Sequence, residues 1–156
     1  MKKPSPTHDD TFMDEALGLA REAAAADEVP VGAVIVRDGH IIARASNQVE
    51  TRKDALAHAE MLVLAEAEKI TGDWRLTDCT LYVTKEPCLM CAGAIIHTRL
   101  KKVIFGVGDP KAGGFGGAVD LNKLPGVNHR CEYVAGIGEA ESLSLLQDFF
   151  KKKRLA

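Results

Sequence analysis

The sequence has no apolar run long enough to cross a bilayer, and its 20 basic and 22 acidic residues leave a net charge of only −2. Apolar segments such as VGAVIV at 31–36 are far shorter than the roughly 20 residues that a transmembrane helix needs. No apolar stretch follows Lys2 and Lys3, so we expect neither a signal peptide nor a membrane anchor. These absences predict a cytoplasmic protein, in which cysteines stay reduced.

A net charge near zero gives the chain as a whole no general affinity for nucleic acid. The tail FFKKKRLA is the exception, because its cations Lys151 to Arg154 are consecutive and no acid accompanies them. These cations are either the solvated end of a helix, where they complement the helix dipole, or contacts to phosphate groups. The charge run alone favours the solvated helix end.

Cysteine is scarce: four occur, and only Cys88 and Cys91 form a C-x-x-C pair. A reducing compartment argues against a disulfide, and the absence of a second C-x-x-C pair argues against a closed structural zinc site. The apolar residues between the two cysteines argue against a redox pair of the thioredoxin type. Cys79 and Cys131 stand alone in or beside strands, so we expect them to be small buried hydrophobic residues.

Cys88 and Cys91 lie on one face of a predicted helix, because residues three positions apart are separated by about 60° around its axis. Pro87 suits the entry to that helix, where its missing N–H costs nothing. The free N–H groups and the positive dipole end of the helix favour thiolate over thiol. The pair therefore predicts a site for a soft divalent metal ion.

Of the five histidines, His58 is best placed to complete this site. It stands where the preceding helix begins, and one helix, one loop and one strand separate it from Cys88. His8, His40 and His97 are poorly placed, whereas His129 is an alternative on position alone. Three protein ligands leave one position of a tetrahedral ion open, which is the arrangement of a catalytic site.

Glu60 is the candidate acid–base residue beside this metal site. It lies two positions after His58, about 200° around an ideal helix, so it is not expected to be a ligand. If the helix meets the metal end-on, Glu60 reaches the open position. There it could take a proton from water and pass it to a substrate.

The order of predicted elements indicates an α/β fold. Helices are expected at 10–27, 57–72, 88–100 and 139–154, and strands on both sides of the Asp38-Gly39 turn and at 79–84, 101–107 and 130–137. Seven of the 14 glycines fall between Gly106 and Gly126, where we expect a long irregular loop. We predict a three-layer α/β/α sandwich with a mixed five-stranded sheet. Residues 1–156 would form one domain, with its core at about 10–154 and residues 1–9 flexible.

H-x-E at 58–60 followed by P-C-x-x-C at 87–91 resembles the zinc-dependent nucleoside and nucleobase deaminases, which have a cytidine-deaminase-like fold. Further stretches resemble one branch, the bacterial tRNA-specific adenosine deaminases. They are EVPVGAV, Asn47, TLYVT.EPC.MCAGAI.H.R, VIFG…DPKAG, NHR and the closing FF…R. This resemblance extends over residues 10 to 154.

The resemblance implies hydrolytic conversion of adenosine to inosine at the wobble position, in the anticodon stem-loop of a tRNA. It assigns one Zn²⁺ per subunit to His58, Cys88 and Cys91, and proton transfer to Glu60. It also implies a homodimer. The segment AGAIIH at 92–97 could contribute to the dimer interface, although a role in the core is as plausible. The resemblance further favours RNA contact at 151–154. The substrate contacts that it implies are made by Asn47, the Ala59 backbone N–H, Val31 and Asp109.

The chain departs from the common family pattern at DALAH before His58, at Lys85, and at Gly114 and Gly117. None of the departing positions is a metal ligand, so the reaction class is unaffected. Two alternatives remain open. A deaminase of a free base or nucleoside, of the guanine or cytosine type, would have no use for the cationic tail. A zinc-stabilised nucleic-acid-binding module without catalysis would have no need of Glu60.

Overall fold

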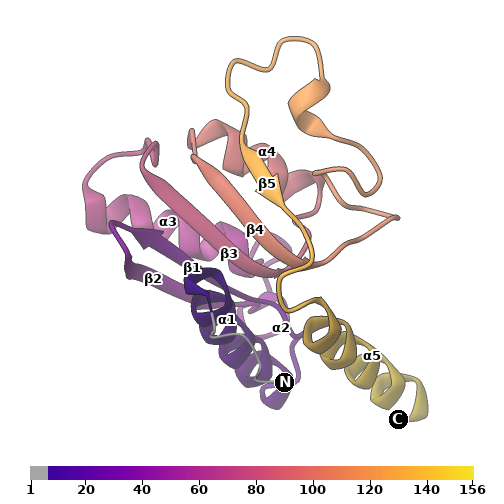
Figure 1. The fold of residues 1–156 in the computed structure, drawn as a ribbon. Helices are drawn as coiled ribbons and strands as arrows, with labels where there is room; N and C mark the ends of the chain where they lie inside the picture. The colour runs from indigo at the N-terminus through magenta and orange to yellow at the C-terminus, as the bar shows by residue number, and fades with distance from the viewer. Residues whose placement is uncertain (1–6) are drawn as a thin grey trace, which may run out of the picture.

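A computed structural model describes residues 7–156 and shows an α/β/α sandwich, as predicted (Figure 1). Its five-stranded sheet has the order β2-β1-β3-β4-β5. β1 is antiparallel to β2 and to β3, whereas β3–β4 and β4–β5 are parallel pairs. The predicted mixed sheet is therefore confirmed.

β1 (Gly32–Arg37) and β2 (His40–Ser46) form the predicted hairpin. Asp38 and Gly39 connect them with φ values of 51° and 74°. Asp and Gly adopt such positive φ angles more readily than most residues, which explains why this dipeptide is found at the turn. β3 (Cys79–Lys85) lies beside β1, and β4 (Lys102–Val107) and the short β5 (Glu132–Val134) extend the sheet.

α1 (His8–Ala25) and α5 (Glu139–Leu155) form one outer layer. Met13 and Leu17 of α1 pack with Val34 and Tyr82 of the sheet in a buried cluster. The close approach of α1 depends on Gly32, since a Cβ there would lie 2.0 Å from the carbonyl oxygen of Ala16. This layer therefore fixes the position of the start of β1.

α3 (Ala59–Thr71) and α4 (Leu89–His97) form the other layer, and Gly72 ends α3 in the left-handed conformation. Alternate residues of β1 point to this side, so Ala33 and Ile35 join its core while Val34 faces α1. Both faces of the strand are covered, as its continuous apolar sequence predicts.

Three details differ from the predicted elements. A one-turn helix, α2 (Val49–Arg52), occupies the polar stretch after the hairpin, and a 3-10 helix, η1 (Leu121–Lys123), interrupts the glycine-rich loop. Of the residues expected to be flexible, 1–6 lie outside the described residues, but His8 and Asp9 begin α1. The side chain of Thr7 caps α1 in a capping box with Asp10. None of the helices described at 7–156 has an apolar stretch of the length that a membrane span requires.

Candidate metal centre and the pocket around it

His58 and Cys88 are the N-cap residues of α3 and α4, and Cys91 lies in the first turn of α4. The side chains of these two N-cap residues face each other across the site. The Nδ1 atom of His58 lies 3.4 Å from Sγ of Cys91 and 3.7 Å from Sγ of Cys88. All three ligand atoms lie within 4.8 Å of one another.

This cluster fits a tetrahedral zinc ion. With Zn–N and Zn–S bonds of about 2.0–2.3 Å, neighbouring ligand atoms should lie about 3.5 Å apart. The measured 3.4 and 3.7 Å separations match this value. In residues 7–156, no other group of three His, Cys, Asp or Glu side chains forms such a cluster.

The other cysteines and the alternative histidine lie elsewhere. Cys79 and Cys131 are buried in the main core, as small hydrophobic residues. The Nε2 atom of His129 lies 2.8 Å from the carbonyl oxygen of Leu100, so this ring is engaged outside the cluster. The structure therefore brings together His58, Cys88 and Cys91 and leaves His129 out.

The cluster favours one thiolate even without an ion. A hydrogen bond from Cys91 lowers the pKa of Cys88 to about 4, with a further contribution from His58 and against the effect of burial. The same hydrogen bond and burial raise the pKa of Cys91. A bound cation would replace the proton that the two sulfur atoms share.

Glu60 lies in the first turn of α3 and is only 4% exposed. Burial raises the pKa of its carboxyl group to about 7, and the neighbouring Cys88 thiolate adds to this effect. A carboxyl group with this pKa can both accept and release a proton near neutral pH.

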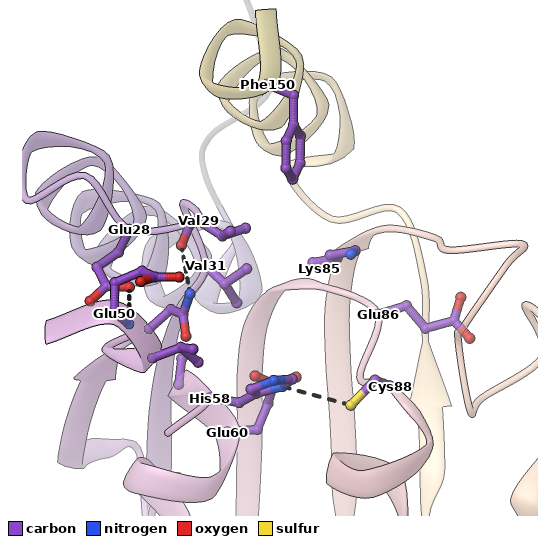
Figure 2. A pocket seen from close by; sticks show the side chains of 13 residues that line it. Glu28, Val29, Val31, Glu50, His58, Glu60, Lys85, Glu86, Cys88 and Phe150 are labelled. Atoms are coloured by element: carbon purple, nitrogen blue, oxygen red, sulfur yellow. Dashed lines mark hydrogen bonds between the residues drawn. The ribbon is translucent and has the colours of Figure 1, made fainter. Parts of the chain in front are cut away.

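A cavity of about 330 Å³ opens beside the cluster, and His58, Glu60 and Cys88 form part of its wall (Figure 2). Three of the predicted substrate contacts, Val31, Asn47 and Ala59, also line it. The predicted metal site, acid–base residue and most of the predicted substrate contacts therefore share one cavity.

Asn47 is held by the segment that precedes β1, and its side-chain oxygen is a free hydrogen-bond acceptor. Its backbone N–H donates to the Val31 carbonyl at 3.0 Å, and Nδ2 donates to the Val29 carbonyl at 3.3 Å. The Oδ1 atom is buried and has no hydrogen-bond partner. Such an orphaned acceptor in a cavity wall can be satisfied by a donor on a ligand.

Glu28 fixes the wall around Asn47. Its carboxylate accepts from the backbone N–H groups of Glu50 at 2.9 Å and Thr51 at 2.7 Å, and from the Thr51 hydroxyl at 2.6 Å. Although burial opposes the effect, these hydrogen bonds lower the pKa of Glu28. This role was not predicted from the sequence, where the only signal was an acid placed between the end of a helix and an apolar strand.

Glu86 fixes the glycine-rich loop in the same way. Its carboxylate accepts from the backbone N–H groups of Asp109 at 2.8 Å, Phe115 at 3.0 Å and Gly117 at 2.9 Å. A Cβ at Gly113 would lie 2.1 Å from Oε2 of Glu86, and one at Gly117 would lie 2.1 Å from the Asp109 carbonyl oxygen. Glycine at these positions lets the loop close around the carboxylate, so much of the loop is ordered by Glu86.

Asp109 does not line the cavity beside the metal cluster. Its Oδ1 atom accepts from the backbone N–H groups of Lys111 and Ala112, and its Oδ2 atom lies 3.3 Å from Nζ of Lys85. Although burial opposes the effect, these interactions lower the pKa of Asp109. Lys85, a departure from the family pattern, lines the cavity. Its ion pair with Asp109 connects the cavity wall to this residue, which is the predicted contact to the neighbouring nucleotide.

Phe150 of α5 completes the outer wall of the cavity, opposite His58 (Figure 2). This residue is 43% exposed, so part of its ring is open to solvent. Lys153, one turn further on, is paired with Asp27 at 2.6 Å. The beginning of the cationic tail therefore lies near the entrance.

Comparison with known proteins agrees with this geometry. Residues 7–154 match the MafB19-like deaminase family. The chain is 49% identical to a tRNA-specific adenosine deaminase of Bacillus subtilis, over 95% of this chain and 92% of that protein. It is 43% identical to a tRNA-specific adenosine deaminase of Agrobacterium fabrum, over 92% of this chain and 95% of that protein.

Two solved structures extend the comparison. One comes from a study of A-to-I editing by tRNA:A34 deaminases at the wobble position of transfer RNA. It superposes with a TM-score of 0.85 at 42% identity, over 87% of this chain and 99% of that one. A guanine deaminase from Bacillus subtilis superposes with a TM-score of 0.63 at 36% identity, over 91% of this chain and 93% of that one.

Proposed function

Because this chain belongs to the family of the tRNA-specific adenosine deaminases, we propose that it hydrolyses an adenosine at the wobble position of a tRNA to inosine. The observation that supports this function best is a cluster of three metal-binding side chains beside a buried carboxyl group, in one cavity. A closed structural metal site would have a fourth protein ligand and no need for Glu60.

His58, Cys88 and Cys91 are proposed to hold one zinc ion per subunit. Zinc held there would act as a Lewis acid and lower the pKa of water at its open position. Two thiolates and a neutral imidazole cancel the charge of Zn²⁺, so proton removal from that water benefits from a nearby base. Glu60 is positioned to be that base.

Glu60 moves the protons of the reaction. Its carboxylate takes a proton from the attacking water and delivers it to the ring nitrogen next to C6 of the adenine. It then takes the remaining hydroxyl proton and delivers it to the amino group, which leaves C6 as ammonia. Water is consumed, ammonia is released and Glu60 returns to its starting state, so the reaction is balanced.

Asn47, Val31 and Ala59 are proposed to hold the base. The free Oδ1 atom of Asn47 can accept from the adenine amino group, and the second Nδ2 hydrogen can face N7, a pairing that recurs in adenine recognition. Val31 supplies an apolar wall, and the backbone N–H of Ala59 lies at the start of α3. Asp109 is proposed to contact the neighbouring nucleotide from the loop.

The competing function is deamination of free guanine, since a guanine deaminase shares this fold at 36% identity. The decisive experiment uses a tRNA transcript whose anticodon begins with adenosine and a matched transcript with guanosine at that position. Inosine in the first transcript, measured by mass spectrometry of the digested RNA, is expected. Release of ammonia only from free guanine, adenosine or cytidine would overturn the proposal.

We also propose that the protein is a cytoplasmic homodimer that binds the anticodon stem-loop. Half of the segment 92–97 belongs to the core, because Ala92, Ile95 and Ile96 are buried. A second copy could instead cover the groove beside α4, whose wall includes Gly93 and the 48% exposed Leu124. Sedimentation of a purely monomeric, active protein would overturn the dimer.

A further inference from the structure

Lys85 is the last residue of β3, and it provides the only Lys or Arg side chain among the described residues that line the cavity. Figure 2 shows it between Phe150 and the His58–Cys88 cluster. Its side chain is 34% exposed and so remains partly open to solvent. The position therefore places one cation at the entrance to the cavity.

The acids of the lining cannot bind a phosphate group. Four of them line the same cavity: Glu28, Glu50, Glu60 and Glu86. The carboxylates of Glu28 and Glu86 are engaged with backbone N–H groups, and Glu60 is buried. Lys85 is therefore the one Lys or Arg of the described lining that can attract the phosphate groups of an RNA strand that delivers a base to this cavity.

The Lys85 ammonium group is held in place but is not saturated. It has three N–H donors, and the pair with Oδ2 of Asp109 uses one of them. Asp109 is itself fixed by the backbone N–H groups of Lys111 and Ala112. A flexible lysine restrained in this way loses less side-chain entropy when it binds a further anion.

We propose that Lys85 contacts a phosphate group next to the target nucleotide and so favours a polynucleotide over a free nucleoside. This inference rests on the proposed function. The contact would be made by the ammonium group, with Asp109 as its second partner. Lys85 is thus a specificity-determining residue and takes no part in the chemical step.

The first test compares Lys85→Met with Lys101→Met on an anticodon stem-loop RNA. Lys101 is exposed and precedes β4, at the opposite end of the parallel strands. Lys85→Met should raise KM about three- to tenfold and reduce the slope of log affinity against log salt by about 0.7–0.9. The kcat should be unchanged, Lys85→Arg should retain most of the affinity, and Lys101→Met should behave as wild type.

Stability must be measured in parallel. The Lys85–Asp109 pair is only partly exposed, but Asp109 keeps its bonds to the backbone N–H groups of Lys111 and Ala112 in the variant, so Lys85→Met should melt within a few degrees of the wild type. If Lys85→Met does not fold, Lys85→Gln provides the second uncharged variant. A folded, uncharged variant with wild-type KM and salt slope would overturn the inference.

The second test removes the charge from the RNA instead. Stem-loops carry a neutral methylphosphonate at the 5′ or the 3′ phosphate of the target adenosine. One replacement should weaken binding to the wild type about three- to tenfold and have no effect on Lys85→Met. Equal effects on both proteins at both positions would overturn direct contact.

These outcomes are separable from failure of the proposed function. If the wild type forms no inosine in the unmodified stem-loop or tRNA, the proposed function fails. If the wild type forms inosine but Lys85 shows no coupling to either phosphate, only the inference about Lys85 fails.

Discussion

The Oε2 atom of Glu86 lies 3.0 Å from the backbone nitrogen of Phe115, and this contact joins the end of β3 to the glycine-rich loop. Glu86 is two positions before Cys88, one of the proposed ligands. Phe115 is 2% exposed and packs against Tyr133 of β5, with ring centroids 5.4 Å apart. One buried carboxylate therefore couples the metal cluster, the loop and the edge of the sheet.

Replacement of Glu86 by Gln should loosen the loop. The Gln amide would direct an N–H group toward backbone donors, leaving buried groups unpaired at a cost of about 1–3 kcal/mol in unfolding free energy. Hydrogen exchange at residues 113–117 should become faster. The matched control is Glu132→Gln on β5, an exposed acid that should have little effect. Unchanged protection in Glu86→Gln would show that other contacts order the loop.

Replacement of Glu60 by Gln should stop turnover and leave the metal in place. An amide cannot carry protons between water and the base, so kcat should fall by about 10²- to 10⁴-fold. Zinc content and melting temperature should resemble those of the wild type. Glu66→Gln, at an exposed position of the same helix, is the control. Full activity in Glu60→Gln would contradict the mechanism.

Removal of one sulfur ligand should remove the metal. Wild-type protein is expected to contain about one zinc per chain, measured by plasma mass spectrometry, and Cys91→Ala should contain little. Cys131→Ala is the matched control, because that thiol is also buried but lies outside the cluster. Equal zinc content in the two variants would exclude the proposed ligand set.

Asn47→Ala should weaken binding of the target adenine. The loss of a bidentate contact is expected to cost about 1–3 kcal/mol, or a roughly 10- to 100-fold fall in kcat/KM. Gln48→Ala serves as the control, since Gln48 is adjacent but does not line the cavity. A wild-type kcat/KM for Asn47→Ala would show that the free Oδ1 atom does not receive the substrate.

Neutralisation of the tail should test its role in RNA binding. Lys151, Lys152 and Arg154 are exposed, whereas Lys153 is paired with Asp27 and should be kept. Replacing the three exposed cations by Ala should weaken tRNA binding and lower the salt slope by about 0.7–0.9 for each phosphate that the tail no longer neutralises. An unchanged slope would identify the tail as a solvated helix end.

The spacing of the residues predicted that Cys88 and Cys91 would lie together at a helix start, with His58 or His129 beside them. C-x-x-C at a helix start has few possible geometries, and an α/β order places helix starts at one edge of the sheet. The structure brings His58 to the same edge, as expected. His129 could not be separated from it by position, because the path of the glycine-rich loop is not encoded in a short motif.

The supporting carboxylates could not be predicted in this way. Glu28 and Glu86 are buried because backbone N–H groups from distant segments converge on them. The same limit applies to Lys85, whose partner Asp109 belongs to another segment. The identity of a single acidic or basic residue does not indicate such partners. From the sequence alone, each of these residues would therefore be predicted to be an ordinary surface residue.

The separation of the ligands along the chain has a consequence for folding kinetics. His58 and Cys88 are 30 positions apart, and in the folded structure they are held together by the pairing of β3 with β1 and by the packing of α3 and α4 on the sheet. The binding site is thus complete only in a nearly native chain. We expect bound metal to slow the unfolding rate strongly and to change the refolding rate little.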